Sequence, residues 1–276
     1  MTDVQKYSYH THNNALGVFD GKSSAEEMIS KAEELGFEAI GVSNHLCVHP
    51  NMPRGVSKMF FSDPEKALDI YKRMYAELDE VAASHKIKVY KGFEVDFFPS
   101  AVWRGWFEKI IKQLDYDYLI GASHFIRSAD ETFLCNIYHL DRLPSATTDE
   151  QMREYLHGYW DNVKGAVESG YFDFMAHLDY CTLFELSSTP EWDDVKWDLI
   201  ETMASRRQAF EINTGGIAKI GRPFPEWRIC DELVKREVPV VVSCDSHDVS
   251  QIGRHFAEVE DYLAEKGCKH RFKLSE

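Results

Sequence analysis

Histidine and acidic residues recur along the 276-residue sequence in pairs whose spacing is typical of metal ligands. His10 and His12 are separated by one residue near the start, and Asp245 and His247 form a similar pair near the end. In an extended chain residues i and i+2 point the same way, so each pair can present two side chains to one ion. Imidazoles with a few carboxylates suit zinc, iron or manganese better than calcium or magnesium, which prefer oxygen ligands alone. The pattern therefore predicts metal binding.

Single residues of the same kinds follow other short apolar segments of the chain. They are His45, Glu94, His124, His177 and Asp179. A lone His or Asp in such a place is more often a structural residue held by hydrogen bonds than a ligand. The prediction of a metal centre therefore depends on the joint pattern, because most of the apolar segments are followed by a side chain that can bind an ion.

The apolar segments themselves have the length and composition of β-strands. They cover residues 7–9, 39–42, 88–93, 116–120, 172–175, 209–212 and 238–242. Amphipathic segments with a helical period lie between them, at residues 24–35, 64–84, 103–113, 149–169, 192–206, 225–235 and 249–266. This alternation predicts an α/β fold with parallel strands. Because the carboxyl ends of parallel strands converge on one face, we expect the candidate ligands to meet there.

Seven repeated strand and helix units favour a barrel related to the eight-unit TIM barrel. An open, doubly wound sheet has the same local pattern and is the alternative. The sequence contains no evident linker, composition shift or internal repeat. We therefore expect a single domain over residues 1–276.

The charge and hydropathy of the chain exclude several classes of function. A net charge of −15 argues against a nucleic-acid binder or a membrane-surface protein, which usually present a basic patch. An anionic substrate is still allowed, because bound divalent cations reverse the local field. No apolar run approaches the roughly 20 residues of a membrane helix, and the first residues lack the pattern of a signal peptide. We expect a cytoplasmic protein that acts on a small metabolite, with its oligomeric state left open.

Short motifs occur in a fixed order along the whole chain. They are HTH at 10–12, Asp20, His45, GFE at 92–94, SH at 123–124, AHLDY at 176–180, EINT at 211–214 and CDSHD at 244–248. Together these motifs resemble the polymerase and histidinol phosphatase (PHP) family. Within that family the sequence is most similar to the stand-alone histidinol-phosphatases, and the likeness covers essentially the whole chain.

The resemblance implies a distorted (β/α)7 barrel of the PHP type, similar to a TIM barrel, and a centre of three divalent metal ions. Zinc, manganese and iron are the candidate ions. The implied ligands are His10, His12, Glu94 and Asp245 for the first ion, Glu94, His124 and His177 for the second, and Asp20, His45 and His247 for the third.

Hydrolysis of a phosphomonoester is the activity that the resemblance implies, with L-histidinol phosphate, a substrate in histidine biosynthesis, as the leading candidate. Clustered metals can turn a bridging water into hydroxide and polarise a phosphoryl oxygen. We expect direct attack by a metal-bridging hydroxide, with Glu94, Asp245 and His247 in the catalytic centre. The alternatives are a PHP phosphoesterase for another phosphomonoester or a nucleotide, a metal-dependent amidohydrolase, and a metal-binding accessory domain without activity.

Residues that bind the phosphate of the substrate are less evident from the sequence. Histidinol-phosphatases commonly place an arginine soon after the EINT motif and, in some, another beyond HLDY, but residues 215–219 and 181–184 contain no arginine. The candidate cations are Lys219, Arg222, Arg127 and Arg254, and an arginine is better suited than a lysine to bidentate binding. The long connection at residues 47–63 is a further candidate for a wall of the substrate pocket.

Overall fold

The computed structural model describes residues 4–275 and contains a sheet whose main path is formed by seven parallel strands in sequence order. These strands are β1 (Tyr7–Ser8), β2 (Ala39–Val42), β5 (Lys88–Asp96), β6 (Tyr118–Ala122), β9 (Phe174–Met175), β10 (Ala209–Asn213) and β11 (Val240–Ser243). Each corresponds to a predicted strand. The parallel α/β fold expected from the alternating pattern is therefore confirmed.

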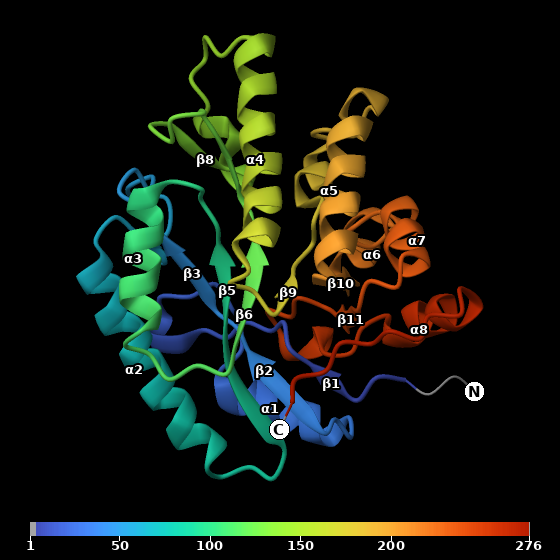
Figure 1. The fold of residues 1–276 in the computed structure, drawn as a ribbon. Helices are drawn as coiled ribbons and strands as arrows, with labels where there is room; N and C mark the ends of the chain where they lie inside the picture. The colour runs from blue at the N-terminus through green and yellow to red at the C-terminus, as the bar shows by residue number, and fades with distance from the viewer. Residues whose placement is uncertain (1–3, 276) are drawn as a thin grey trace.

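The sheet curves into a nearly closed barrel (Figure 1). Beyond the ends of β1 and β11, a parallel bridge pairs Thr11 with Ser246. Nearer the amino end of β1, the side-chain amide of Gln5 forms the hydrogen bonds to β11 that a neighbouring strand backbone would otherwise form. Its Nε2 donates to the carbonyl of Val242 at 2.7 Å, and its Oε1 accepts from the N–H of the same residue at 3.1 Å. These contacts join the first and last strands, and the predicted (β/α)7 barrel is confirmed over the open doubly wound sheet.

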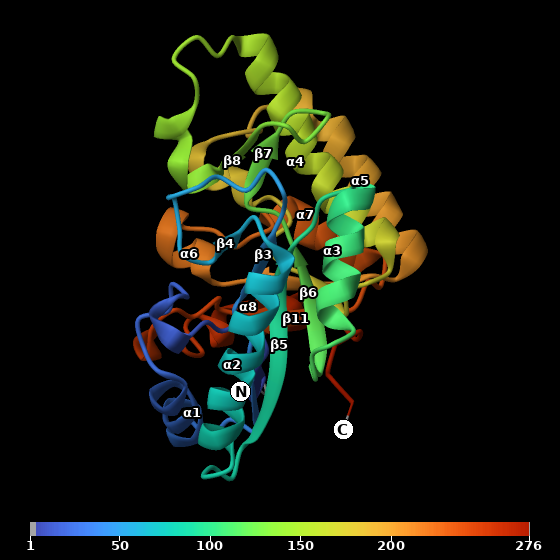
Figure 2. The ribbon, with the colours of Figure 1, turned by 90° about the vertical axis from the view of Figure 1, so that its left-hand side faces the viewer.

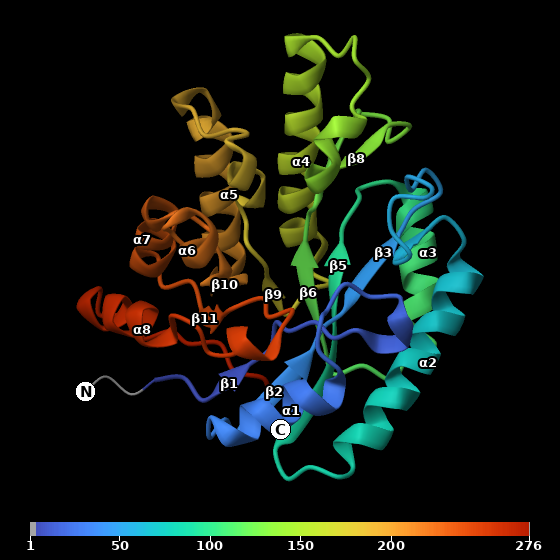
Figure 3. The ribbon, with the colours of Figure 1, turned by 180° about the vertical axis from the view of Figure 1, so that it is seen from behind.

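Helices surround the strands on the outside of the barrel, as the view from behind shows (Figure 3). They are α1 (Ala25–Glu34), α2 (Pro64–Ala82), α3 (Ala101–Ile111), α4 (Asp149–Ser169), α5 (Asp193–Arg206), α7 (Trp227–Lys235) and α8 (Phe256–Glu265). Side-chain caps fix several of the starts: Ser24 forms a capping box with Glu27, and Thr148 forms one with Gln151. Within residues 4–275, none of the helices has the length and apolar character needed to cross a membrane.

The predicted helix at residues 249–266 begins later than expected. Its first part is a 3-10 turn, η5 (Val249–Gln251), and α8 starts only at Phe256. Between the two, Gly253 and His255 adopt positive φ values of 71° and 59°. A left-handed residue interrupts a right-handed helix, so the pattern of apolar residues alone placed this boundary wrongly.

Several short elements were not predicted, and many of them are inserted where strands end. They comprise β3 (His45–Val48), β4 (Phe60–Phe61), β7 (Phe125–Arg127), β8 (Leu134–Asn136), α6 (Gly215–Ile220) and the 3-10 helices η1 (Ala15–Gly17), η2 (Ile137–Arg142), η3 (Tyr180–Phe184) and η4 (Pro190–Trp192). The antiparallel pair β7–β8 and the long helix α4 rise beyond the barrel, next to the connection that follows β3 (Figure 2). These insertions build the rim of the barrel at the carboxyl ends of the strands.

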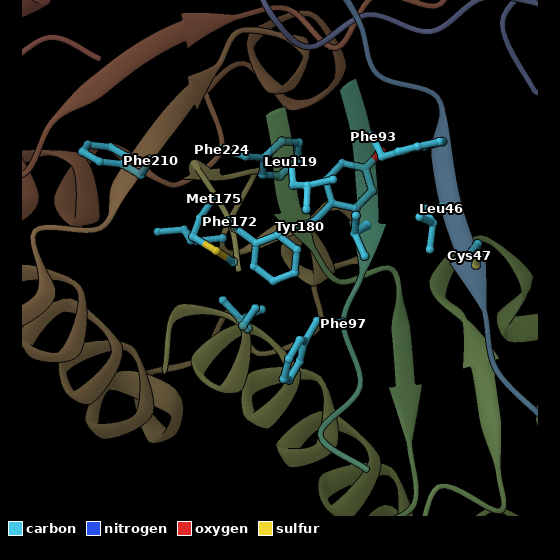
Figure 4. Close-up of a cluster of buried hydrophobic side chains, with 14 of the residues drawn as sticks. Leu46, Cys47, Phe93, Phe97, Leu119, Phe172, Met175, Tyr180, Phe210 and Phe224 are labelled. Atoms are coloured by element: carbon cyan, nitrogen blue, oxygen red, sulfur yellow. The ribbon is translucent and has the colours of Figure 1, made fainter. Parts of the chain in front are cut away.

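Alternating side chains fill the interior of the barrel and cover its outside. On β6, Tyr118 and Ile120 belong to an inner cluster with Tyr9 and Phe174, whereas Leu119 belongs to the outer one. The outer cluster lies between strands and helices, and Figure 4 shows part of it. The interior is therefore a packed floor beneath the strand ends.

Two glycines allow this floor to form. A Cβ at Gly41 or Gly92 would come within 2.1 or 2.2 Å of the side chain of Tyr118. The missing side chains let this ring lie flat across β2 and β5, where its hydroxyl donates a hydrogen bond to the carbonyl of Tyr9. The GFE motif at residues 92–94 thus combines a glycine that makes room below with a glutamate that points into the site above.

Candidate metal centre

The carboxylate of Glu94 lies at the centre of the cluster of predicted ligands. On β5, Gly92, Glu94 and Asp96 share the inner face because strand side chains alternate. The Oε2 atom of Glu94 lies 2.9 Å from His45 Nδ1 and 3.4 Å from His10 Nε2. His45 is close because it is the register partner of Glu94 in the β3–β5 ladder.

The two oxygens of Glu94 face different sets of imidazoles. Its Oε1 lies 2.8 Å from His177 Nε2 and 3.4 Å from His124 Nε2, on the side away from the His10 group. His12 Nε2 lies 3.5 Å from the Oε2 atom, and 3.1 Å from Asp245 Oδ1. A carboxylate placed between two groups of nitrogens has the geometry of a bridging ligand.

A third group lies at the outer edge of the cluster, around Asp20. Its Oδ2 atom lies 3.3 Å from His247 Nε2 and 3.5 Å from His45 Nε2. The ring of His12 lies between these imidazoles, with centroids 4.3 Å from His247 and 4.5 Å from His45. Ligand atoms of these four residues all lie within 4.8 Å of one another. Asp20 is the exposed member of the group, so this edge of the cluster faces the opening.

Buried polar atoms without hydrogen-bond partners collect at this point. Among the residues that the structure describes, they include His10 Nε2, both ring nitrogens of His12, Glu94 Oε2, His177 Nδ1 and Asp245 Oδ1. Buried polar atoms are nearly always paired, so a concentration of unpaired ones requires an explanation. Divalent cations would satisfy those nitrogens and oxygens that face the cluster, one from each residue, and the residues present therefore fit a metal centre.

The charge states of His12 and Glu94 suit cation binding. Burial, together with the neighbouring His247 and His45, lowers the pKa of His12 to about 3, so its ring is neutral at pH 7 and offers a lone pair. Burial alone would raise the pKa of Glu94, but the imidazoles of His124, His10 and His45 hold it well below its usual range. The bridging carboxylate is therefore ionised.

Three imidazoles are oriented by hydrogen bonds on the side away from the cluster. His10 Nδ1 lies 2.8 Å from Glu211 Oε2, and His124 Nδ1 lies 3.1 Å from Asp96 Oδ1. His247 Nδ1 lies 3.0 Å from the carbonyl of Asp245, whose φ of 49° turns the chain at the end of β11. Each contact leaves Nε2 to face the ligand cluster, as metal-binding histidines require.

Glu211 and Asp96 have roles in this geometry that the sequence analysis did not assign. Glu211 is fully buried on β10 and also accepts hydrogen bonds from the N–H of His177 at 2.9 Å and from Asn213 Nδ2 at 2.8 Å. The strand period could have found both residues. Asp96 shares a face with Glu94, and Glu211 precedes the end of its strand by two positions.

Comparison with known proteins agrees with the arrangement of the site. The family model described as "PHP domain" matches residues 8–215. The chain belongs to the PHP family. Asp245 and His247 lie beyond the matched residues, but the structure brings both side chains to the same PHP centre as the earlier ones.

Curated relatives and solved structures extend this similarity. Proteins called probable histidinol-phosphatases are 24% identical in Deinococcus radiodurans, over 94% of this chain and 92% of that protein, and 25% identical in Thermotoga maritima, over 94% and 95%. A structure of the histidinol phosphate phosphatase of Lactococcus lactis, in complex with Zn, L-histidinol and phosphate, has a TM-score of 0.69. It is 17% identical and covers 99% of this chain and 98% of its own, which confirms the PHP fold.

A cavity of about 680 Å³ opens above the PHP centre. Its walls include the predicted ligands Asp20, His45, His124, Asp245 and His247 together with Tyr138, Tyr180, and Val56, Ser57, Met59 and Phe60 of the long connection after β3. The predicted substrate wall at residues 47–63 thus does border the cavity. The volume suits a small metabolite.

Two of the four predicted phosphate-binding cations line this cavity. The Nζ atom of Lys219 lies 3.1 Å from the hydroxyl of Tyr180 and 3.3 Å from that of Tyr138. Arg254 also lines the cavity, and its Nε is buried without a hydrogen-bond partner among the described residues. Tyr180 stacks on His177 with ring centroids 4.2 Å apart, so Lys219 is connected through it to the ligand cluster.

The other two predicted cations do not border the cavity. Arg127 is buried, and its Nε donates to Asn162 Oδ1 at 2.6 Å. Arg222 donates to Asp179 Oδ2 at 3.2 Å and to Thr182 Oγ1 at 2.7 Å. Both guanidinium groups are used in packing interactions, so the expectation that these two bind phosphate does not fit the structure.

Proposed function

We propose that the chain is a metal-dependent phosphomonoester hydrolase. The observation that carries this proposal is the buried Glu94 carboxylate, whose two oxygens face five imidazoles in two separate groups. When bound, divalent ions in such a cluster activate water, polarise a phosphoryl oxygen and stabilise a leaving alkoxide. The proposed ligands are His10, His12, Glu94 and Asp245 for one ion, Glu94, His124 and His177 for a second, and Asp20, His45 and His247 for a third.

Other residues of the chain are proposed to orient the histidine ligands and to bind the phosphate. Glu211 and Asp96 hold the ring nitrogens of His10 and His124 in place. Arg254 is proposed to bind the phosphate, because its guanidinium lines the cavity and its Nε has no partner among the described residues. Lys219, held between two phenol hydroxyls, would supply a second positive charge at the same wall.

L-Histidinol phosphate is the first substrate to test. This choice is supported by the names of the curated relatives and by the bound L-histidinol and phosphate of the Lactococcus lactis structure. A cytoplasmic location remains a prediction from the sequence. If the purified protein releases phosphate from any ester, it is neither an amidohydrolase alone nor an inactive accessory domain.

The decisive experiment counts metals and products together. The purified chain is analysed for zinc, manganese and iron by mass spectrometry, and phosphate release is measured from a panel of phosphomonoesters that includes L-histidinol phosphate. We expect at least two tightly bound ions per chain and turnover of a phosphomonoester. A chain with fewer than two tightly held ions, or with activity on carboxamides alone, would contradict the proposal.

A second candidate substrate class is favoured by a specific observation. The arginines that histidinol-phosphatases commonly place after EINT and HLDY are absent from residues 215–219 and 181–184. The cations that do line the cavity, Lys219 and Arg254, come from other positions. Another phosphomonoester is therefore the alternative to L-histidinol phosphate within the same reaction.

A further inference from the structure

A second cavity of about 220 Å³ adjoins the one above the metal centre, and we call it the annex. The two cavities share Val56, Asn136 and His139 in their walls. The annex is bordered by the connection after β3 on one side and by β8 and η2 on the other, which are the insertions at the rim of the barrel (Figure 2). The two cavities are therefore neighbours in the same rim of the barrel.

Two arginines give the annex a positive charge. Arg54 comes from the connection after β3, and Arg142 is the last residue of η2. Both are exposed, and within residues 4–275 neither guanidinium has an ion pair or hydrogen bond in the structure. No carboxylate lines the annex among the described residues. In a chain with a net charge of −15, two arginines in the wall of one pocket that has no lining carboxylate form a local exception to the overall charge.

Outside the metal centre, the larger cavity resembles the annex, because its charged lining residues are cations. The carboxylates that line it, in the part of the chain that is described, are Asp20, Asp96 and Asp245, and all three lie in or directly against the ligand cluster. The lining cations are Lys22, Lys219 and Arg254. An ammonium group on a substrate would thus find no separate carboxylate, whereas additional negative charge would find several cations.

We propose that the annex binds a second anionic group of the substrate, so that the preferred substrate is a phosphomonoester that also carries a carboxylate or another phosphate. This inference rests on the proposed phosphatase function and specifies the substrate class of the same site. Water adds to the phosphorus, the P–O bond to the alcohol breaks, and the alcohol leaves with a proton on its oxygen. The second anionic group stays on the alcohol, bound at the annex by Arg54 and Arg142.

Matched pairs of substrates test the proposal directly. The metal-loaded protein is assayed for phosphate release with 3-phosphoglycerate against glycerol 3-phosphate, and with fructose 1,6-bisphosphate against fructose 6-phosphate. In at least one pair we expect kcat/KM to be about tenfold or more higher for the ester with the extra anion, mainly through a lower KM. L-Histidinol phosphate, whose second charged group is cationic, serves as the reference ester.

The double variant Arg54→Gln and Arg142→Gln identifies the residues responsible. We expect it to reduce the ratio of kcat/KM within the preferred pair by about tenfold, because the charge-assisted contacts to the second anion are lost. The matched control is Arg73→Gln with Arg104→Gln, which removes the same two charges from α2 and α3, away from both cavities. The ratio in the control should equal that of the wild type.

Binding measured without turnover separates this inference from the proposed function. Titration calorimetry compares 4-phosphonobutyrate with butylphosphonate, and we expect the carboxylate to strengthen binding in the wild type and not in the Arg54/Arg142 variant. Absence of hydrolysis of every ester would contradict the phosphatase proposal. Hydrolysis or binding without a preference for the second anion, or a preference that persists in the double variant, would overturn the role of the annex.

Discussion

Glu94 is the residue on which the proposed chemistry depends most. Its carboxylate is 1% exposed, and its two oxygens face two groups of imidazoles. A negative charge at this position would reduce the electrostatic repulsion between two metal cations bound on either side of it. Among the described residues, Asp20 faces the outer imidazoles of His247 and His45, and Asp245 faces His10 and His12 through one oxygen, so neither is placed between the two groups as Glu94 is.

The change Glu94→Gln tests this role. We expect it to reduce both metal content and kcat/KM by more than the roughly 10- to 100-fold that is typical of residues behind the ligands, because an amide lacks the charge to bridge two cations. Mass spectrometry of bound metals and phosphate release measure the two effects. Glu150→Gln, at an exposed glutamate in the first turn of α4, is the control. Full metal content and activity in the Glu94→Gln variant would contradict the bridging role.

Glu211 acts behind the ligands, and the change Glu211→Gln tests whether it positions His10. Glutamine keeps one acceptor oxygen, but it lacks the charge and cannot accept from both His10 Nδ1–H and the N–H of His177, so we expect metal affinity or activity to fall by roughly 10- to 100-fold. Glu260→Gln is a matched control, because this buried glutamate pairs with Arg271 at a distance from the metal centre, near the amino end of the barrel. Equal metal affinity in the two variants, measured by competition with a chelator, would exclude a positioning role.

Arginines that line the cavity are expected to affect substrate binding, whereas those packed elsewhere are expected to affect stability. Arg254→Ala should raise KM about tenfold, because a charge-assisted contact to phosphate is lost. Arg222→Ala should instead lower the free energy of unfolding by about 2 kcal/mol, since it leaves the buried Asp179 without its ion pair. Steady-state kinetics and urea unfolding distinguish the two. A larger change in KM for Arg222→Ala than for Arg254→Ala would reverse the assignment.

At the level of the elements, the sequence predicted the strands and helices that repeat and missed those that do not. The seven barrel strands and the helices between them bury one apolar face each, and this burial leaves a period that the sequence shows. The pair β7–β8 contains only three residues in each strand, and β3 continues β2 after an interruption at residues 43–44. The strands of β7–β8 are too short to show a period, and β3 is held by its pairing with β5, which is distant in sequence.

The candidate site was more predictable than its surroundings for a related reason. A proposed ligand such as His177 stands directly after an apolar run, so its position can be predicted without knowing the fold. Glu211 and Tyr180 depend on which neighbour they meet in space. Arg127 illustrates the converse, because it follows the proposed ligand His124 closely but is buried against Asn162.

The rim insertions are joined by a buried glutamate, Glu131, which follows β7. Its Oε2 lies 2.8 Å from His49 Nε2, its Oε1 accepts from the N–H of Ser100 at 3.0 Å, and its carbonyl accepts from Asn51 Nδ2 at 2.8 Å. Burial would raise the pKa of Glu131, but the hydrogen bonds from His49 and Ser100 lower it. The charged form is therefore the one that holds the connection after β3 against the start of α3.

Stability as a function of pH tests this contact. Because the pKa of Glu131 is lower in the folded than in the unfolded chain, its contribution is complete above the unfolded value and is lost as the pH falls through the folded one. Glu131→Gln should therefore cost about 1 kcal/mol at pH 7, and this difference should shrink below about pH 4. Urea unfolding at several pH values measures it, and a difference that does not change with pH would contradict the assignment.

For the whole molecule, the ligand cluster connects elements from both ends of the chain. The proposed ligands lie in β5 or after β1, β2, β6, β9 and β11, so we expect metal binding and closure of the barrel to be coupled. We expect a chelator to lower the melting temperature by roughly 10 °C for each ion that is held at about a thousandfold above its dissociation constant. Calorimetry with and without added zinc or manganese measures the change. An unaltered melting temperature in the metal-free protein would show that the centre adds nothing to stability.

The contact of Gln5 with Val242 gives the barrel an unusual junction. These residues are 237 positions apart, and a side-chain amide rather than a ladder of backbone hydrogen bonds joins the strands there. Above this junction, His12 Nε2 on one side lies 3.1 Å from Asp245 Oδ1 on the other. An ion held by both would act as a reversible cross-link between the first and last parts of the chain. The supply of metal would then regulate how often the barrel opens between β1 and β11. After metal loss, the backbone amides of these two strands would be the first to exchange hydrogen with solvent.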